Sequence, residues 1–182
     1  MKKFFITASV ALMTLTTISC KKTILSLFPG FDVKVPDMQV TLPPIPIVPA
    51  EEVQIGSITS HFNLDSTIRA NTGNVFNISH VTSMKVSKMV ATLSNGNVLN
   101  NLSNFESGRF LIYSNANTTP GPLATFSFPT TETYTFTGNT DNAPDIVSYY
   151  TGTEITYQLY GKLRRPTTQQ LNLTVSTTIR VN

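Results

Sequence analysis

The chain has 182 residues, of which 40% are hydrophobic and 13% charged, with one Cys, two His and no Trp. This length suits one domain that can bury a core without disulfide staples. The charged share is about half of that in an average soluble domain, which excludes a coiled coil and a highly charged disordered tail. A lone Cys excludes an internal disulfide framework and a multi-Cys zinc site.

The first twenty residues have the organisation of an export signal. Lys2 and Lys3 form a positive start, and an apolar stretch follows over 4–18. This stretch is too short for a permanent membrane-spanning helix, which takes about 20 residues. It ends in Thr-Ile-Ser-Cys at 17–20, before the chain turns polar. Removing the signal takes two lysines and lowers the formal charge from +3 to +1, so the basic composition predicts no nucleic-acid partner.

The sequence at 17–20 resembles the signal peptide and lipobox of bacterial lipoproteins. In that family the Cys, here Cys20, becomes the first mature residue and carries acyl chains such as palmitate. Thr17 departs from the family pattern, which usually has an aliphatic residue there, whereas Ile18 and Ser19 fit it. The resemblance implies a cell-envelope protein anchored by lipid to the outer membrane, on its periplasmic side or at the cell surface. The alternatives are a plain secretory signal with an incidental Cys, or a short N-terminal anchor.

A proline-rich segment follows over residues 20–52. Proline fixes the backbone and donates no hydrogen bond, so this composition predicts an extended spacer. Phe31, Val33 and Val35 nevertheless alternate with polar residues, which is the period of a strand. We therefore predict that 31–42 is edge-strand material leaning on the domain, with Pro36 ending the pairing or marking a sheet edge. The predicted organisation is a signal peptide over 1–19, a lipidated Cys with spacer and edge strand over 20–52, and a β-sandwich over 53–182.

Alternation of apolar and polar residues recurs from Val53 to the C-terminus, between segments rich in Gly, Pro and Asn. Gly56 is predicted to mark a bulge or a bend. Asn95-Gly96 predicts a type I′ hairpin, because that turn needs two positive φ angles. The only helical candidate is a single turn at Asp145–Tyr150, with Asp145 as its cap. Strands are predicted near 53–64, 84–93, 109–113, 123–128, 134–137, 155–161 and 171–181.

This pattern predicts an all-β fold, a single antiparallel β-sandwich of about seven to nine strands. Any likeness to an immunoglobulin domain is architectural, because the chain has no Trp and no pair of cysteines. Residues 105–181 also resemble, weakly, small uncharacterised β-sandwich lipoproteins of gram-negative bacteria. The resemblance rests on the apolar strand at 110–113, the turn at 145–150 and the strands that follow, and it implies no activity.

The residues that catalysis requires do not form a recognisable constellation. No Gly-x-Ser-x-Gly elbow is present, and His61 and His80 are predicted to be surface or edge residues. A glycosidase needs two facing carboxylates, and only Glu132 and Glu154 are acidic in the later strands. No phosphate-binding loop and no metal-ligand spacing appears. The sequence therefore predicts no enzyme, no catalytic residues and no cofactor.

Three weaker features have functional and structural interpretations. Asp141, Asn142 and Asp145 could offer oxygens to Ca²⁺, but turn and cap roles explain them as well. Asp65-Ser66-Thr67 resembles an O-glycosylation sequon of some gram-negative envelopes, which would place a sugar on Ser66, and a plain turn is the alternative. A basic cluster could touch anionic lipid or polysaccharide, although a solvated strand end is the simpler interpretation. It consists of Lys162, Arg164 and Arg165.

Three functions remain open at this stage. The first is a non-enzymatic, membrane-anchored envelope lipoprotein whose sandwich binds or scaffolds a protein or glycan partner. The second is a structural or adhesive surface subunit that joins its partners by strand addition, for which the extended 31–42 segment would be the donor. The third is an envelope hydrolase acting on polysaccharide or peptidoglycan, for which Glu132 and Glu154 would be the acidic pair.

Overall fold

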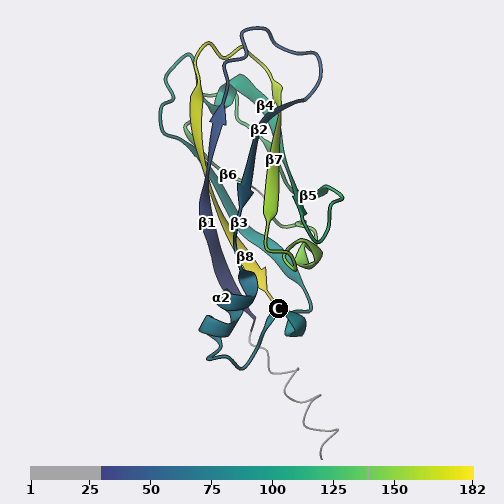
Figure 1. Cartoon of the computed structure of the whole chain (residues 1–182). Helices are drawn as coiled ribbons and strands as arrows, with labels where there is room; N and C mark the ends of the chain where they lie inside the picture. Colours follow the sequence, from purple (N-terminus) through teal and green to yellow (C-terminus); the bar gives the residue numbers. More distant parts are fainter. Residues whose placement is uncertain (1–29, 139) are drawn as a thin grey trace, which may run out of the picture.

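The structure, a computed structural model, describes residues 30–138 and 140–182 (Figure 1). The predicted signal peptide and Cys20 lie outside the described residues. Within them the fold is all-β, as the alternation predicted, with two four-stranded antiparallel sheets packed as a sandwich. No helix in these two ranges is long and apolar enough to cross a membrane.

In each sheet, with one exception, neighbouring strands are distant in sequence. The first contains, from edge to edge, β1 (Phe31–Leu42), β8 (Leu171–Val181), β3 (Met84–Leu93) and β6 (Thr135–Thr137). The second contains β2 (Val53–Ser60), β7 (Ile155–Leu163), β4 (Phe105–Ser114) and β5 (Gly121–Ser127), of which β4 and β5 follow each other along the chain. The short helical elements are α2 (Leu64–Asn71), η1 (Ile78–His80), η2 (Leu102–Asn104) and η3 (Val147–Tyr149).

The core lies between the sheets and is formed by alternate residues of each strand. In β7 and β8 nearly every second side chain is buried, because successive side chains of a strand point to opposite faces. Tyr157 illustrates this rule: it is buried, whereas Tyr160, at an odd spacing on the same strand, lies on the outer face. Burial raises the pKa of Tyr157 to about 12, and its hydroxyl is 3.0 Å from that of the buried Tyr150.

The 31–42 segment is an edge strand, as predicted. Val33 and Val35 are buried and Phe31 packs against the core, while the side chains between them face solvent. The register with β8 shifts between Val35 and Met38, so Pro36 lies where the ladder is interrupted. β1 therefore pairs with β8 of its own chain on both sides of this interruption, which removes the observation that suggested it as a donor strand for a neighbour. The predicted bulge at Gly56 is also present, in the pairing of β2 with β7.

The Asn95-Gly96 hairpin is a wrong prediction. β3 pairs with β8 and β6, and the chain after Leu93 crosses to the other sheet before β4 begins. Among the described residues only Gly73 and Asn74 have positive φ, so Asn95-Gly96 does not form a type I′ turn. The local turn signal is overridden by the hydrogen bonds of a longer Asn-rich loop, described below.

Helix α2 was not predicted, because Leu64 was assigned to the end of a strand. Asn63 caps the helix by accepting a hydrogen bond from the Ser66 N–H, and Leu64 and Ile68 bury one face at i,i+4 spacing. The helical turn expected at Asp145–Tyr150 is the shorter 3-10 element η3. Asp145 was predicted as its cap, but the N-cap is Ile146, which makes no side-chain cap hydrogen bond; the Asp145 carboxylate, one residue earlier, accepts from the Val147 N–H at 3.0 Å.

Thr177 interrupts the apolar inner face of β8. Its buried Oγ1 is the one buried side-chain polar atom without a hydrogen-bond partner in the part of the chain that the structure describes. Valine has nearly the same shape without the desolvated hydroxyl. We expect Thr177→Val to raise the free energy of unfolding by about 1 kcal/mol, measured by urea denaturation. Thr178→Val, on the outer face of the same strand, is the control and should change it by less than about 0.5 kcal/mol; a destabilised Thr177→Val would contradict the assignment.

Candidate functional site

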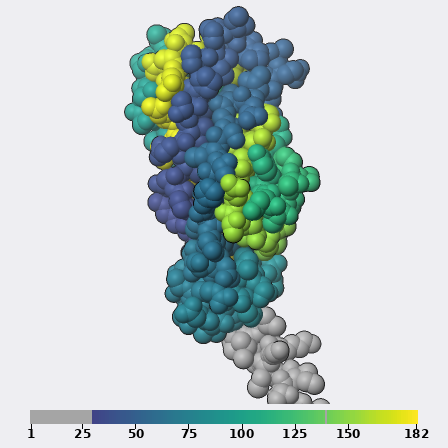
Figure 2. Space-filling model, viewed as in Figure 1, coloured from purple at the N-terminus to yellow at the C-terminus, as the bar shows by residue number. Residues whose placement is uncertain are grey.

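The two ends of the sandwich differ in their chemistry (Figure 1). β1 begins at one end, where the C-terminus also lies, since Phe31 pairs with Val181. The opposite end, here called the distal tip, is formed by the segments 43–52, 94–104 and 164–170. Figure 2 shows the first and third of these packed together at the upper end of an elongated molecule. The backbone of Thr167 exchanges two hydrogen bonds of 2.9 Å with Ile45.

Buried asparagine amides hold the distal tip together. The Asn101 amide donates to the carbonyls of Asn97 and Val98, both at 3.0 Å, while its oxygen accepts from the Ser103 N–H at 3.0 Å. The Asn104 amide donates to the carbonyls of Leu99, at 2.9 Å, and Pro166, at 2.8 Å. These amides take the place of a regular ladder, so a loop of irregular backbone is fixed in one conformation.

The braced loop presents apolar side chains to solvent. Val98 and Leu99 are 67% and 76% exposed, and Ile47, on the neighbouring 43–52 segment, is 80% exposed. The Asn100 oxygen accepts from the Thr168 N–H at 2.7 Å, which ties this loop to the segment that also holds Ile45. A fixed loop with exposed apolar side chains is suited to contact with another molecule.

The predicted basic cluster is part of the same bracing. The Arg164 guanidinium donates to the carbonyls of Ser103, at 2.9 Å, and Phe128, at 3.3 Å. Arg165 donates to the Ser103 hydroxyl at 2.5 Å, and Lys162 forms an ion pair of 3.2 Å with Glu106. These cations are therefore engaged by protein groups instead of standing free at a solvated strand end, which also weakens the interpretation as a surface for anionic lipid or polysaccharide.

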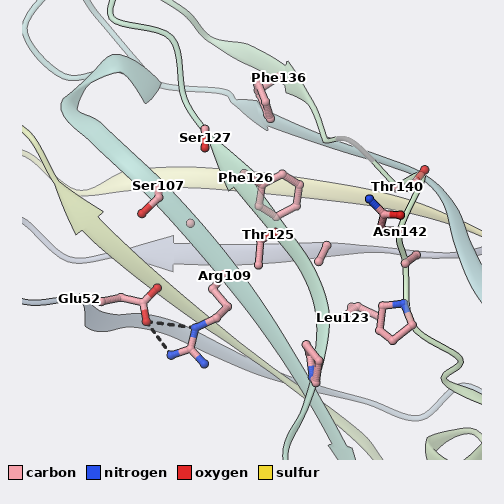
Figure 3. A pocket seen from close by; sticks show the side chains of 15 residues that line it. Glu52, Ser107, Arg109, Leu123, Thr125, Phe126, Ser127, Phe136, Thr140 and Asn142 are labelled. Carbon is pink, nitrogen blue, oxygen red and sulfur yellow. Dashed lines mark hydrogen bonds and ion pairs between the residues drawn. The ribbon is translucent and has the colours of Figure 1, made fainter.

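A groove of about 780 Å³ runs along β5 (Figure 3). One wall consists of the consecutive residues 122–127 and the adjoining part of β4 at 107–109, and Phe136 and the segment 140–144 form the other. Hydroxyl and amide groups dominate its polar lining. These come from Ser107, Thr125, Ser127, Thr140 and Asn142.

The ionic groups of the groove neutralise each other. The Arg109 guanidinium donates from Nε and from one terminal nitrogen to the same Glu52 oxygen, at 3.1 and 2.6 Å. Its hydrogen bond to Glu52 raises the pKa of Arg109 further above its ordinary value. The guanidinium also lies 4.9 Å from the centre of the Tyr160 ring. The groove therefore offers little net charge to a ligand.

The candidate hydrolase residues are not brought together. Glu154 directly precedes β7 and Glu132 lies beyond its far end, beside Thr133, whose N–H donates to Asn101 of the distal tip. The nine residues of β7 separate these ends by about 30 Å. His61 Nε2 lies 3.9 Å from Glu154 Oε1, but both side chains are exposed. His80 Nδ1 lies 2.8 Å from the Asn77 side-chain oxygen, where it forms part of the cap of η1. Within residues 30–138 and 140–182, neither the groove along β5 nor the smaller pocket beside Phe31 is lined by two carboxylates.

The Ca²⁺ candidates also have structural surroundings. Asp145 accepts backbone hydrogen bonds from Met84, at 3.3 Å, and Val147, so its carboxylate serves as a local cap. Asp141 and Asn142 are exposed. Over 30–138 and 140–182 no group of three or more His, Cys, Asp or Glu side chains could hold a metal ion.

Ser66 lies exposed in the first turn of α2. The preceding Asp65 is engaged twice, by Arg69 at 2.7 Å and by the Ile78 N–H at 2.8 Å. The hydroxyl is thus accessible to solvent beside a carboxylate that is held in place. Glycosylation of Ser66 stays a prediction.

Comparison of the chain with protein-family models finds no match, and comparison with curated proteins finds none either. The regions that the structure distinguishes, the distal tip and the groove along β5, were not predicted as sites. A signal for the first was present, since five of the ten residues from 95 to 104 are Asn. Asparagine at this density is unusual for a simple turn and is suited to bonding irregular backbone.

Proposed function

We propose that this protein is a lipid-anchored, non-enzymatic binding protein of the bacterial envelope. The observation that carries the proposal is the Thr-Ile-Ser-Cys sequence at 17–20, together with a sandwich that the chain enters at the end opposite to the distal tip. A β1 of 12 residues spans about 40 Å, so an anchor at Cys20 would leave the distal tip facing away from the membrane, with the groove along the side of the sandwich.

The lack of a facing carboxylate pair among the described residues argues against the hydrolase alternative, and so does the engagement of His80 in a helix cap. The exposed tip and the neutral groove suit contact with a protein or an uncharged ligand. Lipid anchoring would concentrate such contacts at one surface, because two or more acyl chains hold a protein stably in a bilayer.

The anchor is tested by changing its single acyl site. We expect Cys20→Ala to abolish incorporation of labelled palmitate. The Cys20→Ala chain, whether processed or not, should no longer be recovered with acylated proteins in the detergent-soluble fraction. Ser19→Ala is the matched control, because it keeps a small residue before the Cys and should leave labelling intact. Equal palmitate labelling of Cys20→Ala and the wild type would contradict the proposal.

A further inference from the structure

The four sheet edges of the sandwich are not equally protected. β1 carries Asp32, Lys34 and Asp37 along its edge and is interrupted at Pro36, features that discourage pairing with other chains. β2 lies against β1. β6 has only three residues, and residues after β6 continue along the edge of β3 and hydrogen-bond to it. There the Gly138 N–H donates to Met89 and the Ile146 N–H to Met84, both at 2.9 Å.

β5 differs from these edges. It has no charged residue, and it pairs with β4 on one side only. The Phe128 N–H donates to the Glu106 carbonyl at 3.1 Å, so alternate residues preceding Phe128 also direct their backbone groups toward β4. The backbone groups of Thr125 and Ser127 consequently point away from β4, into the groove that follows β5.

The two sides of the groove have different polarity. Toward the other sheet it is lined by Phe136, Ala143 and Pro144, which are partly buried, and the first two pack against the core. Toward the outer face it is lined by hydroxyls and by the mutually neutralised pair of Arg109 and Glu52. A strand added to β5 would place its side chains alternately against these two surfaces.

We propose that the free edge of β5 binds an extended segment of a partner protein as a fifth strand. The segment is uncharged, about five or six residues long, and alternates apolar residues facing Ala143 and Pro144 with hydroxyl or amide residues facing Thr125. This inference rests on the proposed binding function and names its partner class. It also retains strand addition as a mode of assembly, with this chain as the acceptor instead of the donor.

A peptide fits this groove better than a glycan does. Sugar rings bind by stacking on exposed aromatic faces, whereas the two aromatic rings that line the groove are both covered: Phe126 is only 5% exposed, and Phe136 is partly buried against the core. The unpaired amides and carbonyls at Thr125 and Ser127 are instead spaced for another strand. The groove along β5 spans about 20 Å, which matches a segment of five or six extended residues.

The test uses the full chain in detergent and a synthetic Thr-Val-Thr-Val-Thr-Val peptide, with amide hydrogen exchange followed by NMR. We expect the peptide to slow exchange of the Thr125 and Ser127 amides at least tenfold. N-methylation of the alternate amides that pair with β5 should abolish this protection, whereas N-methylation of the other set should leave it. Unchanged exchange at saturating peptide would overturn the proposal. So would equal protection by both N-methylated peptides, or protection by peptidoglycan fragments alone.

Variants separate backbone pairing from side-chain contact. Thr125→Pro removes an N–H that points away from β4 and should weaken peptide binding at least tenfold. Thr178→Ala, on the outer face of β8 in the other sheet, leaves the groove untouched and should change binding less than twofold. Ala143→Asp places a charge on the apolar side of the groove without touching β5 and should also weaken binding at least tenfold. Full binding by Ala143→Asp would overturn the site even if Thr125→Pro fails to fold. A chain acylated at Cys20 that binds no peptide would refute the β5 site alone, and an unacylated chain that binds it would refute the anchor alone.

Discussion

Deletion of β1, residues Phe31–Leu42, is expected to abolish cooperative folding of the sandwich. The strand buries five apolar side chains, each contributing about 1.5–3 kcal/mol, and this sum is comparable with the whole stability of a typical domain. Its loss would also expose the edge of β8 and the core beneath it. Circular dichroism of the deleted chain should show no cooperative thermal transition. The buried side chains are Val33, Val35, Met38, Val40 and Leu42.

The control for this deletion lies on the solvent face of the same strand. Lys34 and Asp37 form an exposed ion pair of 3.4 Å, and exposed pairs contribute little to stability. Lys34→Ala combined with Asp37→Ala should therefore change the free energy of unfolding by less than about 1 kcal/mol. A deleted chain that still melts cooperatively within a few degrees of the wild type would mean that β1 is only a tether.

Asn101→Ala is expected to have the largest effect of any single asparagine substitution in the distal tip. Asn101 is fully buried, and its amide satisfies the carbonyls of Asn97 and Val98 and the Ser103 N–H. Each buried polar group left without a partner costs about 1–3 kcal/mol. We expect a loss of about 3 kcal/mol in the free energy of unfolding, measured by urea denaturation, with a fall in Tm of about 6–12 °C.

Asn142→Ala provides the comparison, because Asn142 is an exposed residue of a different loop. It should leave the free energy of unfolding within about 0.5 kcal/mol of the wild type. If Asn101→Ala behaved like Asn142→Ala, the buried amides would not hold the tip, and the exposed Val98 and Leu99 would belong to a loop without a fixed conformation.

The strands were predictable because alternation is a local property of the sequence. β8 shows it over its whole length and β1 on both sides of Pro36, and their inward faces agree with the predicted ones. The connections between the strands were harder to predict from the sequence. Asn95-Gly96 has the composition of a hairpin, yet β3 pairs with β8, and this order depends on hydrogen bonds between distant segments, such as that from Thr168 to Asn100.

Helix α2 was missed for a related reason. Its apolar residues Leu64 and Ile68 directly follow a strand, and an eight-residue helix carries too few turns for its periodicity to stand out. The one sequence feature that could have indicated the helix was Asn63, a residue type favoured at helix N-caps.

The groove was not predictable from local sequence at all. The sequence of Gly121–Ser127 predicts one strand among several. Its residues do not indicate whether this strand is paired on both sides or lies at the edge of a sheet. Only the sheet order places β5 at an edge, and only the path of 140–144 gives the groove its second wall. The roles of Arg164 and Arg165 likewise depend on groups that are distant in sequence, carbonyls for Arg164 and the Ser103 hydroxyl for Arg165.

The central claim, a lipid-anchored envelope protein, is tested most directly by intact mass spectrometry of the chain extracted from membranes. We predict a mature protein that begins at Cys20 and is heavier than the sequence 20–182 by the mass of its acyl chains. A single species with the unmodified mass of 1–182, or a chain that begins after Cys20 and carries no lipid, would contradict the account.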